Sequence, residues 1–434
     1  MTNQTRHRFA ALTIALALGA CVDKGELPGP PFEAMVLDQT GYDPNYKVGK
    51  HELVRASLDS INDFEELTGP LYQFRRGGIL RARDIAGSVI ADGQFREGES
   101  PDLRYVVRDG AAIARDYNTL VMLSSAYQFE QLLPRLKDAS GYGVEELQRK
   151  YGRMVVFFEP RIELEGATVI HQTGKFNAFF NPAGGQFGLA RRSSAEDTPL
   201  AIDRKAIGHE LGHAVFQLDF YHGEDPNCDE DLAERNEREA WFPGRLPYEF
   251  VIAGLNEGFA DWHSFTLTHA VDVLANQSLP EPDERDITMD TFDWDDLPTD
   301  EDEADEDDLK CHGAFYCLGT MFARSLYRTF EARGLDPDDE ADRYAFMHEV
   351  AAALNTVQDS MRAADSLPVS DDKVAKCERR EYLTPELDAP ILGGFMQALL
   401  EALPDETAAL LCPELAQRFK DGFPEENRVG CEAP

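Results

Sequence analysis

The chain has few basic residues and no long apolar run beyond its first twenty residues. It holds 42 lysine and arginine residues against 80 aspartate and glutamate residues, which gives a formal net charge of −38. Such a surplus repels phosphates and argues against nucleic acid as a partner.

No later segment is long and apolar enough for a transmembrane helix. Cysteine occurs only seven times and never as a CxxC pair, which argues against a metal site built from thiolates.

The N-terminus has the proportions of a secretory signal. Residues 6–8 are basic, and the apolar stretch 9–20 is too short to span a bilayer. The segment Leu18-Gly19-Ala20-Cys21 resembles the bacterial lipobox, which implies that Cys21 is lipidated and becomes the mature N-terminus. A plain signal peptide with an incidental cysteine is the alternative. Because Val22 follows the cysteine, lipoprotein sorting rules favour a lipid anchor in the outer membrane of a bacterial cell envelope.

Histidine is also scarce, yet two of the ten histidines stand four residues apart in His209-Glu210-Leu211-Gly212-His213. Side chains at i and i+4 share one helix face, so both histidines can bind a single zinc ion. Glu210 can then reach a water on that metal and accept its proton. The same stretch also fits an amphipathic core helix, and the two interpretations are compatible. The apolar stripe of that helix consists of Ile207, Leu211, Ala214, Val215 and Leu218.

A catalytic zinc site needs a third protein ligand and leaves its fourth position to water. Glu257 and Asp261 lie one turn apart on a second predicted helix, away from the apolar positions Leu255, Phe259 and Trp262. Glu257 can complete a His-His-Glu set. Asp261 can accept the other ring N–H of a ligand histidine and fix its tautomer. A solvated acidic face is the alternative for both residues.

These motifs resemble those of the gluzincins, the thermolysin and fungalysin group of zinc metallopeptidases. The group has HExxH followed by a helix with NExxxD, a pattern met here by His209, Glu210, His213, Asn256, Glu257 and Asp261. The interval between the motifs is longer than usual, so residues 219–248 look like a surface insertion. The resemblance implies an α+β fold with a mixed N-terminal lobe, a mainly helical C-terminal lobe, and one zinc ion per chain in the cleft between them.

By this resemblance, each motif residue has an expected role. The zinc ligands are His209, His213 and Glu257. Glu210 is the catalytic base. Asp261 and Asn256 support the ligands from the second layer of contacts.

A second resemblance lies before the zinc helix. Residues 176–182 and 184–189 have the alternation and glycine-rich turn of a hairpin. At about this distance, thermolysin-like enzymes place an edge strand with an Asn-Ala-Phe sequence that pairs with the substrate backbone. The resemblance therefore implies that Asn177 and Ala178 contact the substrate. An ordinary hairpin is the alternative.

A third segment bears on the group that stabilises the oxyanion opposite the zinc. Residues 311–326 resemble the fungalysin helix H-x-x-G-x-x-W/F-A-x-x-L, but Tyr316 stands where that family has its histidine. His312 lies one helical turn earlier and could serve instead. We prefer Tyr316, because it lies three residues before Gly319, in register with the family. A core tyrosine without a catalytic role is the alternative.

The remaining cysteines and the acidic run carry weaker signals. Excluding Cys21, six cysteines remain beyond the zinc helix, an even number that predicts three disulfides with fifteen possible connectivities.

Residues 281–308 are dominated by acidic side chains, and Arg285 is their only cation. Such a run favours a solvated loop. Calcium is not predicted there, because the run lacks an EF-hand loop.

The length allows about two globular units. We predict a signal peptide at 1–20, a tether at 21–45, a mixed α/β lobe with the substrate edge strand at 46–200, and a helical lobe with the zinc site and disulfides at 201–434. Periodicity predicts a helix over 117–136 and a buried strand over 154–158 in the mixed lobe. It predicts further helices over 318–330, 344–354 and 392–403 in the helical lobe.

These features favour a lipid-anchored zinc endopeptidase that acts on proteins or peptides. Glu210 would accept a proton from the metal's water and pass it to the leaving amine. A surface binding protein that keeps the gluzincin fold without turnover is the first alternative, although such a protein would be expected to lose Glu210 or a ligand. A zinc hydrolase of a non-peptide substrate is the second alternative.

Overall fold

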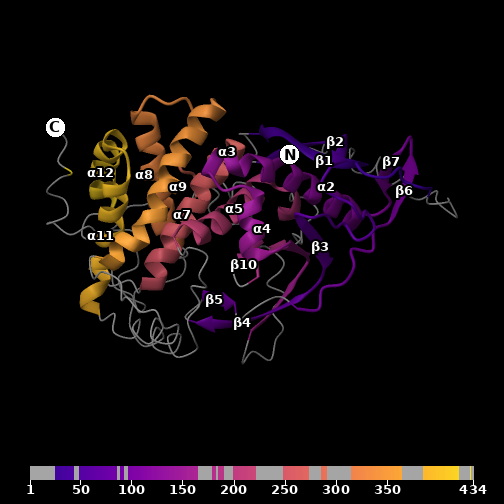
Figure 1. Cartoon of the computed structure of the whole chain (residues 1–434), viewed down its shortest axis with the longest axis horizontal. Coiled ribbons are helices and arrows are strands. Elements are labelled where there is room, and N and C mark those ends of the chain that lie inside the picture. The colour runs from indigo at the N-terminus through magenta and orange to yellow at the C-terminus, as the bar shows by residue number, and fades with distance from the viewer. Residues whose placement is uncertain are drawn as a thin grey trace, which may run out of the picture.

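Among the residues that the structure describes, the strands and three α-helices lie in the first part of the chain, and the second part is mainly helical (Figure 1). The computed structural model describes residues 25–43, 48–85, 88–91, 96–164, 178–181, 184–189, 199–220, 248–272, 285–290, 314–363, 385–419 and 431. Within these residues every β-strand lies before residue 190, and long helices dominate from residue 204 onward. This division confirms the predicted α+β class, with a mixed part followed by a mainly helical part.

The strands form three small sheets. The first has the order β2 (Val48–Leu58), β1 (Phe32–Asp43), β7 (Ala111–Ala114) and β6 (Tyr105–Arg108). The second has the order β10 (Ala178–Asn181), β11 (Gln186–Leu189), β8 (Met154–Phe158) and β3 (Tyr72–Arg76). The third has the order β5 (Ser88–Ala91), β4 (Ile79–Ile85) and β9 (Arg161–Leu164).

The second sheet contains both strand predictions. The predicted strand over 154–158 is β8. The predicted hairpin is the antiparallel pair of β10 and β11, in which Ala178 is opposite Leu189 and Asn181 is opposite Gln186. Because β10 has a neighbour on one side only, it forms an edge of this sheet within the described residues.

The predicted tether over 21–45 is wrong from Phe32 onward. That stretch is β1, which pairs with β2 on one side and with β7 on the other. Ala34 and Val36 are fully buried in this strand. Burial alternates along this strand with the period of two of a half-buried strand, but Met35 and Leu37 on its other face are also apolar, so the residue types do not show the alternation. The preceding proline-rich segment suggested an extended linker instead.

Helix α2 (Tyr117–Leu132) follows the first sheet. Its N-terminus is capped by the Asp116 carboxylate, which accepts a 2.8 Å hydrogen bond from the Thr119 N–H. The helix ends four residues before the predicted boundary because Pro134, which lacks an N–H, lies in the 3₁₀ turn that follows. Two short helices then lead to β8, namely α3 (Leu136–Ser140) and α4 (Val144–Tyr151).

The helical part holds the longer helices. They are α5 (Arg204–Asp219), α7 (Tyr248–Thr268), α8 (Ala314–Ala332), α9 (Glu340–Ala363), α11 (Pro385–Ala402) and α12 (Asp405–Phe419). The last four include the helices predicted over 318–330, 344–354 and, to within one residue, 392–403. In the described part of the chain, no helix is both long and apolar enough to cross a membrane.

Helix α7 runs through the centre of the helical part. Trp262 is fully buried and packs its ring against Phe265, Phe330 and Phe346, with centroid separations of 5.1, 5.7 and 5.2 Å. Each fully buried aromatic side chain of this kind contributes about 1.5–3 kcal/mol to the hydrophobic stabilisation. The position of α7, and of any side chain on its other faces, is therefore fixed by large packed groups.

Two glycines allow neighbouring helices to approach α7 closely. A Cβ on Gly212 of α5 would lie 2.7 Å from the Ala260 Cα, and a Cβ on Gly258 of α7 would lie 2.2 Å from the Gly319 carbonyl oxygen of α8. Both separations are far below van der Waals contact. The glycine within HELGH therefore has a packing role, because it brings the histidine helix against α7.

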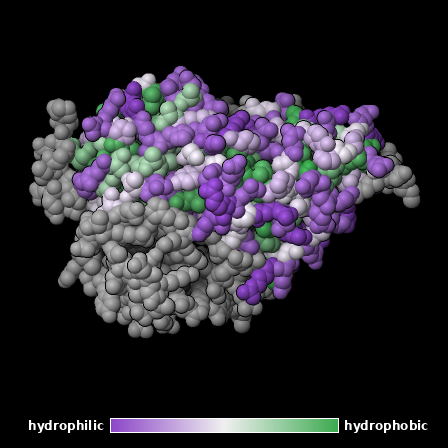
Figure 2. Space-filling model, viewed as in Figure 1, coloured by the Kyte–Doolittle hydropathy of each residue, from purple (hydrophilic) through white to green (hydrophobic). Residues whose placement is uncertain are grey.

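The mixed and helical parts share one continuous core, which runs from Ala34 in β1 to Cys431 near the C-terminus. At the start of α5, the Arg204 guanidinium donates to Asp38 of β1 at 2.7 Å and to Gln128 of α2 at 2.8 Å. Where Figure 2 is coloured by hydropathy, the surface is mostly hydrophilic with hydrophobic residues scattered over it, as expected for so acidic a chain. Helix α5 is thus anchored at its first residue to the mixed part.

Disulfides occur in the helical part, as predicted for that half of the chain. Cys412 of α12 is bonded to Cys431, with 4.9 Å between their Cα atoms. Cys317 of α8 is also disulfide-bonded, and its partner lies outside the described residues. The remaining cysteines of the three predicted disulfides, Cys228, Cys311 and Cys377, lie outside the described residues.

Candidate metal centre

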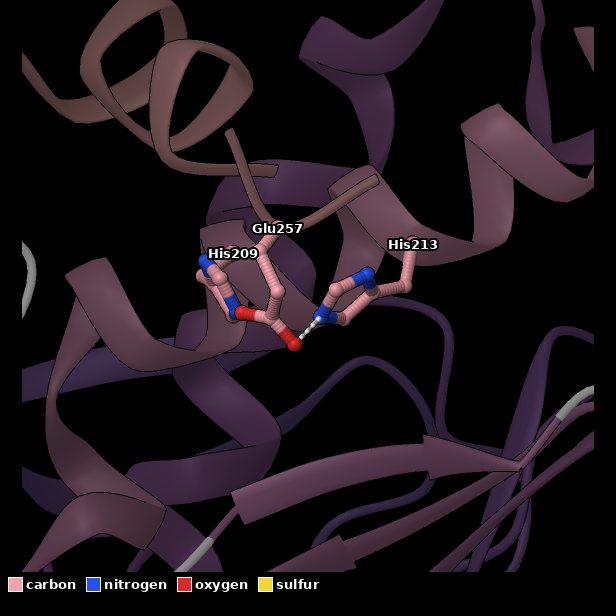
Figure 3. Close-up of side chains that lie close together, drawn as sticks. All are labelled: His209, His213 and Glu257. Atoms are coloured by element: carbon pink, nitrogen blue, oxygen red, sulfur yellow. Dashed lines mark ion pairs between the residues drawn. The ribbon is translucent and has the colours of Figure 1, made fainter. Parts of the chain in front are cut away.

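The two histidines of HELGH lie one turn apart on α5, and their ring centroids are 4.5 Å apart. The helix begins at Asp203, whose carboxylate accepts a 3.0 Å hydrogen bond from the Lys205 N–H. The apolar stripe of α5 is buried from Ile207 to Val215, and Leu218 at its end is partly buried. The packed stripe fixes the helix, and the histidines project from it toward α7 (Figure 3).

Glu257 of α7 faces both histidines (Figure 3). Its Oε2 lies 3.3 Å from the His209 Nε2, and its Oε1 lies 3.6 Å from the His213 Nε2. In a tetrahedral zinc site with ligand bonds of about 2.0–2.2 Å, neighbouring ligand atoms are about 3.3–3.6 Å apart. His209, His213 and Glu257 each offer one atom within 4.8 Å of the others, so these residues form a group that could hold a metal ion.

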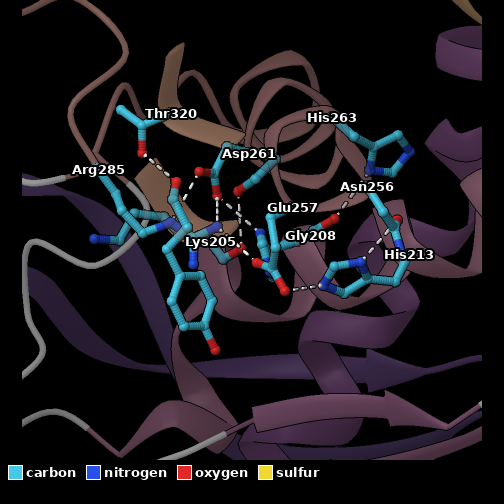
Figure 4. A network of polar contacts seen from close by, with 12 residues as sticks. Lys205, Gly208, His213, Asn256, Glu257, Asp261, His263, Arg285 and Thr320 are labelled. Atoms are coloured by element: carbon cyan, nitrogen blue, oxygen red, sulfur yellow. Dashed lines mark hydrogen bonds and ion pairs between the residues drawn. The ribbon is translucent and has the colours of Figure 1, made fainter. Parts of the chain in front are cut away.

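The other ring nitrogen of each histidine lies beside an oxygen acceptor. The His209 Nδ1 lies 2.9 Å from the Asp261 carboxylate, and the His213 Nδ1 lies 3.0 Å from the Asn256 side-chain oxygen. Both partners are acceptors, so each Nδ1 carries a proton. Despite burial, Asp261 and Glu257 raise the pKa of His209 to about 9, so a metal would displace a proton from its Nε2, whereas the His213 Nε2 keeps its lone pair. Figure 4 shows this network around Glu257. The two imidazoles are thereby oriented with their metal-binding nitrogens toward the same point.

Arg285 completes the network, although the sequence pattern placed it in a solvated acidic loop. It is 5% exposed, and its guanidinium donates to Asp261 at 2.6 and 2.9 Å and to Glu257 at 3.0 Å. The prediction of a solvated loop over 281–308 is therefore wrong for Arg285 and Ile287, which are buried, whereas Met289 and Asp290 are exposed. The signal in the sequence was the presence of one cation in a run of acids, because a lone arginine pairs readily with buried carboxylates.

Glu210 lies beside the group on α5 and is 4% exposed. Its Oε2 has no hydrogen-bond partner among the described residues. The backbone N–H of Phe180 in β10 donates to the Glu210 carboxyl group. A buried carboxylate with a free oxygen is costly unless a ligand or water completes it, so this side chain is arranged to receive a further group.

Burial and charge set the protonation of the centre. Burial alone would favour a neutral Glu257, but the Arg285 guanidinium and a protonated His209 hold the pKa of its carboxyl well below the usual range. Burial raises the pKa of Glu210 to about 7 and lowers that of His213 to about 4. His213 is thus neutral at physiological pH, as a metal ligand must be. The pKa of Arg285 is raised, despite its burial, by Asp261 and Glu257.

Tyr316 lies on the first turn of α8, next to Arg285. The guanidinium carbon of Arg285 is 5.1 Å from the centre of the Tyr316 ring. The Tyr316 side chain is 37% exposed, and partial loss of hydration together with the Glu257 carboxylate raises the pKa of its hydroxyl, which therefore keeps its proton at neutral pH. His312, the other candidate donor, lies outside the described residues.

Of the two predicted substrate contacts, the structure describes Ala178 but not Asn177. Ala178 is the first residue of the edge strand β10 and is buried, and β10 packs against α5. Asn177 and Cys21 lie outside the described residues. The edge strand and the helix with the two histidines are therefore direct neighbours.

His263 also belongs to this region, although the sequence pattern gave no reason to select it. It is fully buried, and its Nδ1 donates to the Gly208 carbonyl of α5 at 2.9 Å. Burial lowers its pKa to about 4. The neutral ring braces α7 against α5, just behind the two histidines that face Glu257.

No known protein family model matches the chain, and no curated protein matches it. Among solved structures, the chain is similar to the precursor of protealysin, a metalloproteinase from Serratia proteamaculans. The TM-score is 0.30 with 13% sequence identity, over 74% of this chain and 89% of that chain. Because both values are low, the function proposed below is based on the contacts of the candidate metal centre.

Proposed function

We propose that the protein is a zinc-dependent endopeptidase. The observation that carries this proposal is the convergence of His209, His213 and Glu257, with the buried carboxyl of Glu210 on the same helix. Two histidines and one carboxylate are a ligand set of catalytic zinc sites, which keep the fourth position open. The spacing of the three ligand atoms and the fixed Nδ1 protons support zinc as the metal.

When bound, zinc would supply a Lewis acid that polarises a substrate carbonyl and lowers the pKa of a water. In the proposed mechanism, Glu210 accepts a proton from that water at its free carboxylate oxygen and later gives it to the leaving amine. Asp261 and Asn256 hold the two histidine rings in place. Glu257 stays ionised because Arg285 contacts it.

The edge strand β10 supports a peptide as the substrate. An extended peptide can add to an exposed edge through main-chain hydrogen bonds. Since the Phe180 N–H already contacts Glu210, a peptide aligned on this strand would lie next to the proposed base. We propose that Ala178, with Asn177 beside it, contacts the substrate backbone.

The direct test is peptide hydrolysis with and without zinc. Purified protein is expected to cleave members of a diverse peptide library at internal bonds. A zinc chelator should abolish cleavage, and added zinc should restore it. Binding of peptides without cleavage, in protein that holds zinc, would instead support a binding protein. Cleavage of a non-peptide bond alone would support a different zinc hydrolase.

We propose Tyr316 as the donor that stabilises the developing oxyanion. Tyr316→Phe should lower kcat by about 10- to 1000-fold with little change in KM or zinc content, because such a donor acts mainly in the transition state. Steady-state kinetics and metal analysis of the variant provide the measurement. A nearly normal Tyr316→Phe enzyme beside a severely impaired His312→Ala enzyme would transfer the role to His312.

We also propose that Cys21 carries a lipid anchor, based on the lipobox-like segment before it. Two or more acyl chains would give stable membrane attachment, at about 0.8 kcal/mol for each buried CH₂ group. Mass spectrometry of the mature protein should find an acylated Cys21 at the N-terminus. An unmodified N-terminus at another residue would refute the anchor.

A further inference from the structure

Residues 285–290, here called the strap, connect the candidate metal centre to helix α8. Ile287 is fully buried, and its N–H donates to the Val271 carbonyl at 2.9 Å. Its own carbonyl accepts a 3.0 Å hydrogen bond from the Arg324 guanidinium of α8. The strap is therefore held at its middle from two sides.

A second attachment leads to α5. Asp286 of the strap forms an antiparallel bridge with Asp272. The Asp272 carbonyl accepts a 3.1 Å hydrogen bond from the Lys205 ammonium, which is buried in α5 one turn before His209. The first half of the strap is thus connected to the helix that carries both histidines.

The end of the strap is held by charge. The Asp290 Oδ1 accepts hydrogen bonds from Arg324 at 3.2 Å and from Arg418 of α12 at 2.7 Å. Arg328 lies 3.9 Å from the other oxygen. Arg324 is only 2% exposed, and both hydrogen bonds of its guanidinium within the described part of the chain go to the strap. A buried guanidinium is costly unless its hydrogen bonds are kept. The folded protein therefore favours the one position of the strap in which Arg324 keeps both bonds.

We propose that Arg324 is a positioning residue for the metal centre and that it acts through Arg285. It fixes the Ile287 carbonyl and the Asp290 carboxylate, and these fix the strap that carries Arg285 to Glu257 and Asp261. This inference rests on the proposed zinc site. If Arg324 has this role, helices α8 and α12 affect the zinc affinity although none of their described side chains is a proposed ligand.

The test is a double-mutant cycle on the apoprotein, with the zinc dissociation constant as the readout. Loss of a residue that orients metal ligands typically costs about 10- to 100-fold in metal affinity. Arg285→Gln should weaken zinc binding by about that factor, and Arg324→Gln by about 10-fold. Because both act on the same contact, the double variant should lie within about twofold of Arg285→Gln alone.

Two further variants keep the test independent of folding defects. Asp290→Asn changes a carboxylate that is 63% exposed, so it should fold normally and still weaken zinc binding several-fold. Arg343→Gln is the matched control, because Arg343 is also buried and bonds the backbone carbonyls of Thr266 and Pro337 away from the strap. It should lower Tm and leave the zinc dissociation constant unchanged.

The outcomes separate this inference from the proposed function. Wild-type zinc affinity in Arg324→Gln and Asp290→Asn, or effects that add in the double variant, would overturn the positioning role and leave the zinc site intact. An equal loss of affinity in Arg343→Gln would also overturn it, as a general effect of stability. A wild-type protein that binds no zinc would remove both proposals.

Discussion

Glu210→Gln is expected to lower peptide hydrolysis by about 10²- to 10⁴-fold, the range for loss of a general base. Glutamine is nearly isosteric with glutamate but cannot accept a proton, so the chemical step should be lost. The side chain is buried and its pKa is raised to about 7 by that burial, so a neutral amide should be tolerated at this position. Zinc content and Tm should therefore stay close to wild type.

The matched control for this variant is Glu145→Gln, which makes the same chemical change at an exposed position in α4. It should leave activity, zinc content and Tm unchanged. Initial rates on one peptide substrate, compared at equal zinc occupancy, provide the measurement. A Glu210→Gln protein that holds zinc and cleaves at more than about a tenth of the wild-type rate would remove Glu210 as the base.

His213→Ala is expected to cause the largest loss of zinc affinity. If three protein ligands share about 10–16 kcal/mol of binding free energy, loss of one removes roughly 3–5 kcal/mol, on the order of 10²- to 10⁴-fold in the dissociation constant. His213 is partly exposed, and its polar contacts in the described residues are with Asn256 and Glu257, so its removal should disturb the fold little. Competition with a chromogenic chelator measures the dissociation constant.

His348→Ala serves as the control for loss of a histidine, since His348 is exposed on α9 and is not in the candidate metal group. Its zinc affinity should equal that of wild type. Glu257→Ala should resemble His213→Ala. Undiminished zinc in either ligand variant would show that the metal is bound elsewhere.

The periodic parts of the fold could be predicted from the sequence. The strand over 154–158 and the hairpin before α5 have strong local signals, namely a short apolar run and glycine-rich turn chemistry. Helix α2 was recognisable from its apolar spacing, and only its end was misplaced, at Pro134. Strand β1 was missed because only Ala34 and Val36 mark its buried face. The prolines just before the strand favoured a linker instead.

The candidate metal centre also has one part that could be predicted from the sequence and one part that could not. His209 and His213 are neighbours by helix geometry, so their proximity follows from the sequence alone. The contact of Glu257 with both of them depends on how α7 packs on α5. Its helical spacing and the resemblance to a known family suggested the contact, but local sequence does not determine that packing. The close approach at Gly212 is what brings α5 against α7.

Arg285 could not be placed from sequence. Its neighbours in the chain are acidic and indicate solvent, whereas its partners Glu257 and Asp261 are more than twenty residues away. Local composition therefore argued against burial, and tertiary pairing of opposite charges outweighed it. A single cation in an acidic run is best treated as a candidate partner for a buried carboxylate.

The most direct test of the central claim is a crystal structure of the purified protein with anomalous diffraction measured at the zinc edge. One anomalous peak is expected in each chain, about 2.0–2.2 Å from the His209 Nε2, the His213 Nε2 and a Glu257 carboxylate oxygen. The Arg285 guanidinium should remain in contact with Asp261. A protein saturated with zinc that shows no peak between these three residues, or a peak bound by other side chains, would contradict the account.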